Sequence, residues 1–425
     1  MLAVFLFSLF GLIVIGLPVA MSLIATGAIM VFVSTGGIPY QILAQGMYRG
    51  IDNFPLLAIP FFMLAGEIMN VGGISDRIVR FSKTMIGHIP GGLGYATVIA
   101  SMLFAAISGS AIASVSAIGA VLIPMMRDNK YDVDTSTALV CTASCLGPII
   151  PPSIPMILYA VNANVSVMDM FLGGIIPGVL IAFALMLVWF FHSKKAQYPR
   201  GKRASAGEML LVTRETTWAL FLPIIIMGGI ISGIATPTES AVVAVVYSLI
   251  VSMFVYRELR FSQLKKVFVN AGLASGATMF FVGGATAVSY MITTAHIPEL
   301  LTDTIFRITT DPYAILLLLN ILMLLVGCVM DVAPAVMILT PILVPLIKLV
   351  GIDPLLFGVV MCTNLILGLL TPPVGAVLYI GCSLSKRNIL QICKAMLPYL
   401  CVMIVVLLTI TYCGQLITFI PNLLK

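Results

Sequence analysis

The segment Gly147-Pro-Ile-Ile-Pro-Pro-Ser153 interrupts a long apolar run over residues 135–164. The segment Gly368-Leu-Leu-Thr-Pro-Pro-Val374 interrupts a second such run over residues 354–382. In hydrocarbon, each backbone N–H or C=O group left unpaired by such an interruption costs several kcal/mol. The breaks therefore persist only where they are buried in protein or line a cavity, and we predict two broken transmembrane helices.

The two segments correspond to each other. A shift of 221 residues places Gly147 on Gly368 and the pair Pro151-Pro152 on Pro372-Pro373. Two further long apolar runs, 92–126 and 312–348, also break in matching places. These breaks are at Ser108-Gly109-Ser110 and around Gly327 to Pro334. Broken apolar segments in corresponding positions of two halves are typical of a secondary transporter whose binding site lies at the breaks.

The composition excludes a soluble protein. Of the 425 residues, 60% are hydrophobic and 9% are charged, whereas soluble domains carry about 25% charged residues. The net charge of +6 does not indicate a nucleic-acid partner, because the basic residues lie in short loops between apolar runs. The three histidines are scattered and the eight cysteines form no Cys-x-x-Cys pair, so we expect neither a metal centre nor haem.

The distribution of basic residues predicts an inverted repeat. If runs 92–126 and 312–348 are re-entrant hairpins, 18 of the 22 lysines and arginines fall on one face of the membrane. That face is then cytoplasmic by the positive-inside rule. The two hairpins enter the membrane from opposite sides, which makes the two halves inverted copies.

The expected organisation follows from these runs. Segments that begin at Ile74 and Ile297 mix apolar and polar residues at helical spacing and are predicted to be interfacial helices that link a moving domain to a fixed one. Residues 2–34 form either one helix kinked at Gly16-Leu17-Pro18 or two short helices. The expected divisions are N-terminal scaffold 1–53, first repeat 54–192, cytoplasmic linker 193–216, scaffold helices 217–270, second repeat 271–394 and C-terminal helix 395–425.

The breaks supply groups that suit a cation and an anion. Unwound carbonyls and half-helix C-termini can coordinate Na⁺, and half-helix N-termini attract an anion. The carbonyls of 108–110 and 147–152 are predicted to form one Na⁺ cage, and those around Gly327, Gly368, Thr371 and Val374 a second. Among the acidic residues in or beside the apolar runs, Asp331 is the strongest candidate for a functional role. Structural roles are favoured for Glu67 and for Glu239, which fits an N-cap turn.

Four stretches resemble the large permease subunit of tripartite ATP-independent periplasmic (TRAP) transporters. They are AAISGSAIASVSAIGAVLIPMM (105–126), GPIIPPSIPMILY (147–159), GCVMDVAPAVMILTPILVPL (327–346) and GLLTPPVGAVLY (368–379). The resemblance covers essentially the whole chain. It implies an all-α polytopic protein of the bacterial inner membrane with two inverted repeats, each with a re-entrant hairpin and a broken helix, arranged as an elevator-type scaffold and transport domain.

The resemblance also implies function and site residues. It implies Na⁺-coupled import of a small carboxylate, a dicarboxylate or sugar acid, with no organic cofactor. The partners would be a small four-helix membrane subunit, expected as a separate chain, and a periplasmic substrate-binding protein. The implied Na⁺ ligands are Ser108, Ser110, Gly147, Ile150, Pro152, Gly327, Gly368, Thr371 and Val374. The candidate substrate contacts, near the two hairpin tips, are Ser108, Gly109, Ser153, Asp331, Pro372 and Pro373.

Two other functions stay open at this point. One is a stand-alone Na⁺-coupled anion transporter of similar architecture that needs no binding protein. The other is a membrane-embedded enzyme or channel. The enzyme is disfavoured because no clustered histidines, cysteines or paired carboxylates occur, and a channel would not show saturable, Na⁺-dependent uptake.

Overall fold

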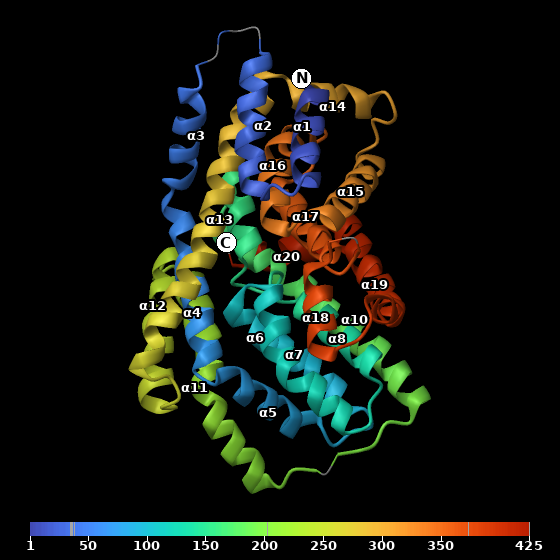
Figure 1. Ribbon diagram of the computed structural model, residues 1–425. Coiled ribbons are helices and arrows are strands. Elements are labelled where there is room, and N and C mark those ends of the chain that lie inside the picture. Colours follow the sequence, from blue (N-terminus) through green and yellow to red (C-terminus); the bar gives the residue numbers. More distant parts are fainter. Residues whose placement is uncertain (35–36, 38, 202, 373, 425) are drawn as a thin grey trace.

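The computed structural model describes residues 1–34, 37, 39–201, 203–372 and 374–424, and within these residues the regular elements are helices. Nine of the described helical segments are long and apolar enough to cross a membrane. The helices form a scaffold, a transport domain that holds both hairpins and both broken helices, and two short connecting arms (Figure 1).

The scaffold is built around one long helix. α13 (Phe261–Thr294) packs against α2 (Val19–Val33), α3 (Gln41–Ile51) and α4 (Ala58–Val71). α12 (Pro237–Ile250) packs on α4, and α11 (Ala206–Ile231) packs on α12. The remaining scaffold elements are α1 (Leu2–Val14), the short 3₁₀ turn η1 (Phe54–Leu57) and the π-helical turn η2 (Val251–Val255).

The transport domain contains two copies of one four-helix pattern. In the first, α6 (Gly92–Ser108) and α7 (Ala111–Asp128) form the hairpin, and α8 (Val133–Ser144) and α9 (Ile154–Ala163) are the two parts of the broken helix. In the second, α15 (Pro312–Val329) and α16 (Val332–Leu349) form the hairpin, followed by α17 (Pro354–Gly368) and α18 (Ala376–Ser385). The predicted hairpins and broken helices are therefore present in both halves.

The two copies interlock. α7 packs against α8 of its own half and against α18 of the other half, while α16 packs against α17 of its own half and against α9 of the other. α10 (Val167–Ala196) and α19 (Ile389–Tyr412) cover this core and contact each other, and α20 (Gln415–Leu423) packs on α10. Each hairpin thus rests on one half-helix from each repeat.

A buried polar contact ties the second hairpin to the second broken helix. The Nδ2 of Asn364 in α17 donates to the Oδ1 of Asn320 in α15 at 2.7 Å and to its carbonyl oxygen at 2.9 Å. Asn320 Nδ2 in turn donates to the hydroxyl of Thr411 in α19 at 3.3 Å. Amide side chains that pair across helices in lipid hold them together, so α15, α17 and α19 are joined as one body.

Two arms connect the domains at opposite ends of the molecule (Figure 1). α5 (Ile74–Ile86) leads from α4 to α6, and α14 (Ile297–Phe306) leads from α13 to α15. Both begin where the sequence predicts interfacial helices. The buried face of α5, which includes Ile74, Ile78 and Val79, lies against α6 and α11, so the arm contacts both domains.

Several helix bounds differ from the expected divisions. The expected linker 193–216 is largely helical, because α10 continues to Ala196 and Ser205 caps α11 by accepting a hydrogen bond from the amide of Glu208. The boundary at 271 falls inside α13, since the polar residues near Lys265 and Lys266 are good helix formers and do not end a helix. The C-terminal helix expected over 395–425 is two helices, because the chain breaks at Cys413-Gly414.

At the N-terminus, the structure decides between two open alternatives. α1 and α2 are separate helices, divided at Gly16, Leu17 and Pro18. Gly16 has φ +96°, a conformation that favours glycine, and Pro18 occupies the N-cap position of α2. The pair forms two short antiparallel helices packed on each other rather than one kinked span.

Candidate functional site

The first hairpin tip lies directly against the first helix break. α6 ends at Ser108, Gly109 adopts φ +60°, and α7 begins after Ser110. A Cβ at Gly109 would lie 2.6 Å from the carbonyl oxygen of Pro152, and a Cβ at Gly147 would lie 2.9 Å from the carbonyl oxygen of Ser110. Only glycine allows backbone to approach backbone this closely at both positions.

The side chains of the first tip support this turn. The Ser110 hydroxyl caps α7 by accepting a hydrogen bond from the Ala113 amide at 3.4 Å. The hydroxyl of Ser108, a residue only 4% exposed, donates to the Ser110 carbonyl oxygen at 3.5 Å. The structure therefore brings four of the five predicted first-cage residues together, namely Ser108, Ser110, Gly147 and Pro152.

Ile150 is the fifth member and behaves differently. Its amide donates to the Leu146 carbonyl at 2.9 Å. Its side chain fills the space beside Gly178 of α10, where a Cβ would lie 2.5 Å from Ile150 Cγ1. The side chain thus anchors the break to α10, and only the backbone of Ile150 remains as a candidate ligand.

The second half repeats this close approach. A Cβ at Gly368 would lie 2.2 Å from the carbonyl carbon of Gly327 and 2.4 Å from its oxygen. The Val374 amide donates to the carbonyl oxygen of Cys328 at 3.2 Å, and the Thr371 hydroxyl donates to the Leu367 carbonyl at 3.2 Å. The second hairpin and the second break therefore meet at the residues that the sequence singled out.

A cavity of about 370 Å³ lies where the two hairpin tips face the scaffold. The transport domain lines it with Gly109 and Ser110 of the first tip, Asp331 of the second tip, and Pro148 and Leu369 of the two breaks. Three half-helices begin at its wall, because Ala111, Ile154 and Val332 are the first residues of α7, α9 and α16. Their N-termini give the cavity a positive partial charge without a basic side chain.

Asp331 is the sole ionisable group among the described residues that line this cavity. It is the N-cap of α16, and its Oδ1 accepts a hydrogen bond from the Val332 amide at 2.8 Å. A carboxylate is favoured at a helix N-terminus, but it would repel an anionic substrate in the same cavity. An anion in this cavity would be attracted by the three helix N-termini and repelled by Asp331.

The scaffold wall of the cavity was missed by sequence reasoning. It consists of Met63 in α4 and of Ala274, Ala277, Thr278 and Phe281 in α13. The spacing of the α13 residues places them on one helix face. The sequence signal for this wall is that three small residues, Ala274, Ala277 and Thr278, share one helix face. An apolar chain contains many such patterns, so this one could not be singled out.

The other predicted substrate contacts are not at the cavity wall. Ser153 is fully buried as the N-cap of α9, where its hydroxyl donates to the Pro148 carbonyl at 2.5 Å and accepts from the Met156 amide at 3.3 Å. Ser108 is buried and Pro372 is exposed, and neither lines the cavity. Pro373 lies outside the described residues. Of the predicted substrate contacts, Gly109 and Asp331 reach the cavity.

The remaining acidic candidates have local partners. Glu239 forms a capping box with Thr236, whose amide donates to the Glu239 carboxylate at 2.8 Å, as its sequence position predicts. Glu67 in α4 accepts a hydrogen bond from Asn270 Nδ2 in α13 at 2.8 Å. Both therefore stabilise the scaffold.

Residues 6–416 match the family model described as "Tripartite ATP-independent periplasmic transporter, DctM component". The chain belongs to this TRAP large permease family. It is 41% identical, over 97% of both chains, to the 2,3-diketo-L-gulonate TRAP transporter large permease protein of Escherichia coli (strain K12). It is 38% identical, over 89% of both chains, to the C4-dicarboxylate TRAP transporter large permease protein of Pseudomonas aeruginosa.

A solved structure shares the fold of this TRAP permease. The Alcanivorax borkumensis YdaH transporter superposes with a TM-score of 0.66 over 93% of this chain and 96% of that one, at 14% sequence identity. The predicted fold class is confirmed: the chain is an all-helical, multi-pass membrane protein with inverted repeats and an elevator-type arrangement. As a TRAP permease it resides in a bacterial membrane, and the relatives named above are transport proteins rather than enzymes.

Proposed function

We propose that this chain is the large membrane subunit of a Na⁺-coupled importer of a small carboxylate. The observation that carries the proposal is the set of charged groups in the cavity between the hairpin tips and the scaffold, which we call the central cavity. Its described lining contains one carboxylate and no basic side chain, so an incoming carboxylate meets only half-helix N-termini as favourable groups. Each hairpin tip meets its break beside this cavity, where packed backbone carbonyls are suited to hold a hard cation.

Coupling follows from this electrostatic balance. With Na⁺ absent, Asp331 and a substrate carboxylate held in the same cavity repel each other as like charges. With Na⁺ bound at one or both tips, the added positive charge compensates both carboxylates. Substrate and ion therefore bind best together, which is the thermodynamic requirement for symport.

The movement we propose is an elevator. The transport domain, made rigid by the interlocked hairpins and broken helices, slides against the α4 and α13 wall of the scaffold while the two arms adjust. The short side chains of Ala274, Ala277 and Thr278 leave room for this movement along part of the wall, beside the larger Met63 and Phe281.

The relatives suggest the class of substrate and the partners. One is named for a sugar acid and the other for C4-dicarboxylates, and a cavity of about 370 Å³ suits molecules of that size. Membership of a tripartite family supports a periplasmic binding protein that delivers the ligand and a small four-helix membrane subunit that assembles with the scaffold.

Uptake into proteoliposomes tests this proposal. We expect saturable uptake of succinate or 2,3-diketo-L-gulonate when the chain is reconstituted with its small subunit and binding protein under an inward Na⁺ gradient. Replacement of Na⁺ by choline should abolish it. Equal uptake in choline would contradict Na⁺ coupling, and equal uptake without the binding protein would favour the stand-alone anion transporter.

A further inference from the structure

A second cavity, of about 480 Å³, lies at the end of the molecule where α5 and the connection between the two halves are found. Three segments line it. Arg80 and Lys83 come from the arm α5, Arg200 and Arg203 from the connection between α10 and α11, and Tyr131 from the turn between α7 and α8. The basic residues of these segments place this end in the cytoplasm by the positive-inside rule.

The described lining of this cavity carries four basic side chains against a single carboxylate, that of Glu208. Arg80 is paired with Glu215 at 3.0 Å. Lys83, Arg200 and Arg203 have no ion pair within the part of the chain that the structure describes. Three unpaired cations that converge on one recess create a local positive potential that attracts a multivalent anion.

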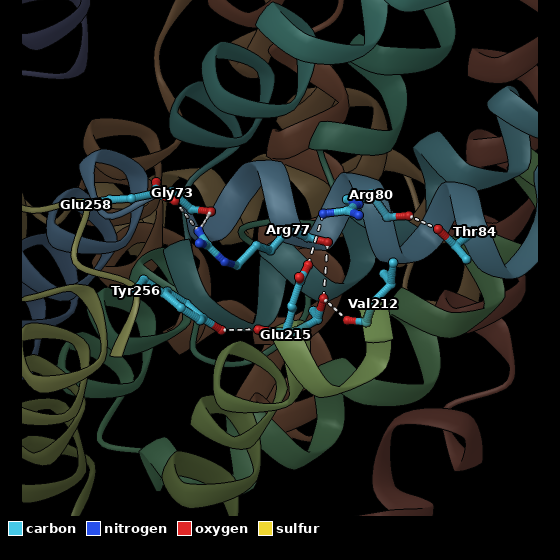
Figure 2. A network of polar contacts seen from close by, with 9 residues as sticks. Gly73, Arg77, Arg80, Thr84, Val212, Glu215, Tyr256 and Glu258 are labelled. Atoms are coloured by element: carbon cyan, nitrogen blue, oxygen red, sulfur yellow. Dashed lines mark hydrogen bonds and ion pairs between the residues drawn. The ribbon is translucent and has the colours of Figure 1, made fainter. Parts of the chain in front are cut away.

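A neighbouring cavity, which is also lined by α5 and shares Arg80 with the second cavity, shows that this imbalance is not a general feature of the cytoplasmic face. That cavity, of about 600 Å³, is lined by three basic and three acidic residues. Arg77 pairs with Glu258 at 2.6 Å and stacks over the ring of Tyr256 at 3.8 Å, and Arg80 pairs with Glu215 (Figure 2). Its basic and acidic residues are equal in number and two of its arginines are paired, whereas basic residues are in excess in the second cavity.

The second cavity also lies at a junction between the domains. The chain passes from scaffold to transport domain through Gly87 to Gly91, and back through Arg200 and Gly201. These two crossings are joined, because the Gly201 amide donates to the Gly87 carbonyl at 3.2 Å and Pro90 and Arg200 form an antiparallel bridge. A ligand in the cavity would contact both crossings and the end of the first hairpin at once.

We propose that this cavity binds a phosphate-bearing anion from the cytoplasmic side and that its occupation slows transport. Phosphate groups match the site because each presents several oxygens to lysine and arginine donors, and two linked phosphates supply enough charge for three unpaired cations. The ligand bridges the arm, the connection and the first hairpin, and so opposes their relative movement. The effect on transport rests on the proposed elevator, whereas binding does not.

Thermal unfolding with inorganic pyrophosphate tests the binding. The wild-type chain in phosphatidylcholine nanodiscs should show a saturable rise in Tm with pyrophosphate, compared with chloride at equal ionic strength. The variant Lys83→Gln/Arg200→Gln/Arg203→Gln should lose this rise. Because all three positions are exposed, the fold should survive, and the single variant Arg203→Gln should weaken binding by about tenfold.

The matched control is Arg257→Gln/Lys265→Gln/Lys266→Gln, which removes three exposed basic residues outside the cavity. It should bind pyrophosphate like the wild type. An equal loss in this control, an equal rise in the cavity variant, or no saturable rise in the wild type in any nanodisc would overturn the proposal.

Nanodiscs that contain phosphatidylglycerol distinguish the two sources of phosphate. If a lipid headgroup occupies the cavity, the wild type but not the cavity variant melts higher in these discs, and pyrophosphate adds nothing further. If the ligand is soluble, pyrophosphate stabilises the wild type in both kinds of disc. A chain that binds pyrophosphate but shows no Na⁺-dependent uptake would support this site while contradicting the proposed function.

Discussion

Gly368→Ala should abolish Na⁺-dependent uptake while leaving the chain in the membrane. The added Cβ would lie 2.2 Å from the carbonyl carbon of Gly327 and 2.4 Å from its oxygen. Both atoms belong to backbone, so no side chain can rotate away, and the second hairpin must move from the second break. Such overpacking costs about 1–3 kcal/mol, and displacement of ligand atoms by about 1 Å can reduce activity by about a hundredfold.

The comparison is with Gly228→Ala in α11 and Gly272→Ala in α13, where a Cβ would meet nothing within 4 Å. Both controls should retain wild-type uptake and Tm. The measurement is initial uptake in proteoliposomes as a function of Na⁺ concentration. Uptake by Gly368→Ala at the wild-type rate, with the same Na⁺ dependence, would show that the contact between Gly327 and Gly368 does not serve ion binding.

Ala277→Trp should remove substrate transport without removing Na⁺ binding. Ala277 lines the central cavity from the scaffold side, so an indole there occupies space that the substrate needs. The two tip contacts involve no residue of α13 and are left intact. We therefore expect uptake at the level of liposomes without protein, while the rise in Tm that Na⁺ produces relative to K⁺ stays close to that of the wild type.

The matched control is Val269→Trp, on the same helix two turns from Ala277, 50% exposed and outside the cavity lining. It should transport normally. Normal uptake by Ala277→Trp would mean that the substrate does not pass between the hairpin tips and α13, and loss of the Na⁺ effect would mean that the ion sites depend on the scaffold.

The parts of the fold that could be predicted are those that depend on short sequence patterns, some of which occur in both halves of the chain. Glycine and proline at 147–153 and 368–374 predict breaks because proline removes helical hydrogen bonds. In a membrane, the backbone groups that are freed must find other partners, so such a break is expected to lie at a binding site. The capping box of Thr236 and Glu239 is predictable for the same kind of reason, since a cap depends on residues only three positions apart. Helix ends in polar stretches were not predictable, as the continuation of α10 to Ala196 and the start of α11 at Ala206 show.

The residues of the hairpin tips and breaks could be predicted from the sequence, but the contacts between helices far apart in the sequence could not. The tip and break residues carry their own signal, but that Gly109 would touch Pro152, or Gly327 would touch Gly368, depends on how helices far apart in sequence pack. The wall formed by Ala274, Ala277 and Thr278 carries no chemical signal at all, because small apolar residues are common in membrane helices. Ser153 is a polar residue at a break that was predicted to contact substrate, but its hydroxyl forms hydrogen bonds within the break itself and does not reach the cavity.

Hydrogen–deuterium exchange with and without Na⁺ tests most directly whether each helix break exists to bind an ion. The chain in nanodiscs would be compared in Na⁺ and in K⁺ at equal ionic strength, with exchange followed by mass spectrometry. We predict that Na⁺ slows exchange around Gly109 and Gly147 in the first half and around Gly327 and Gly368 in the second, while α11 and α12 are unaffected. Identical exchange in the two salts at all four glycines would contradict the account.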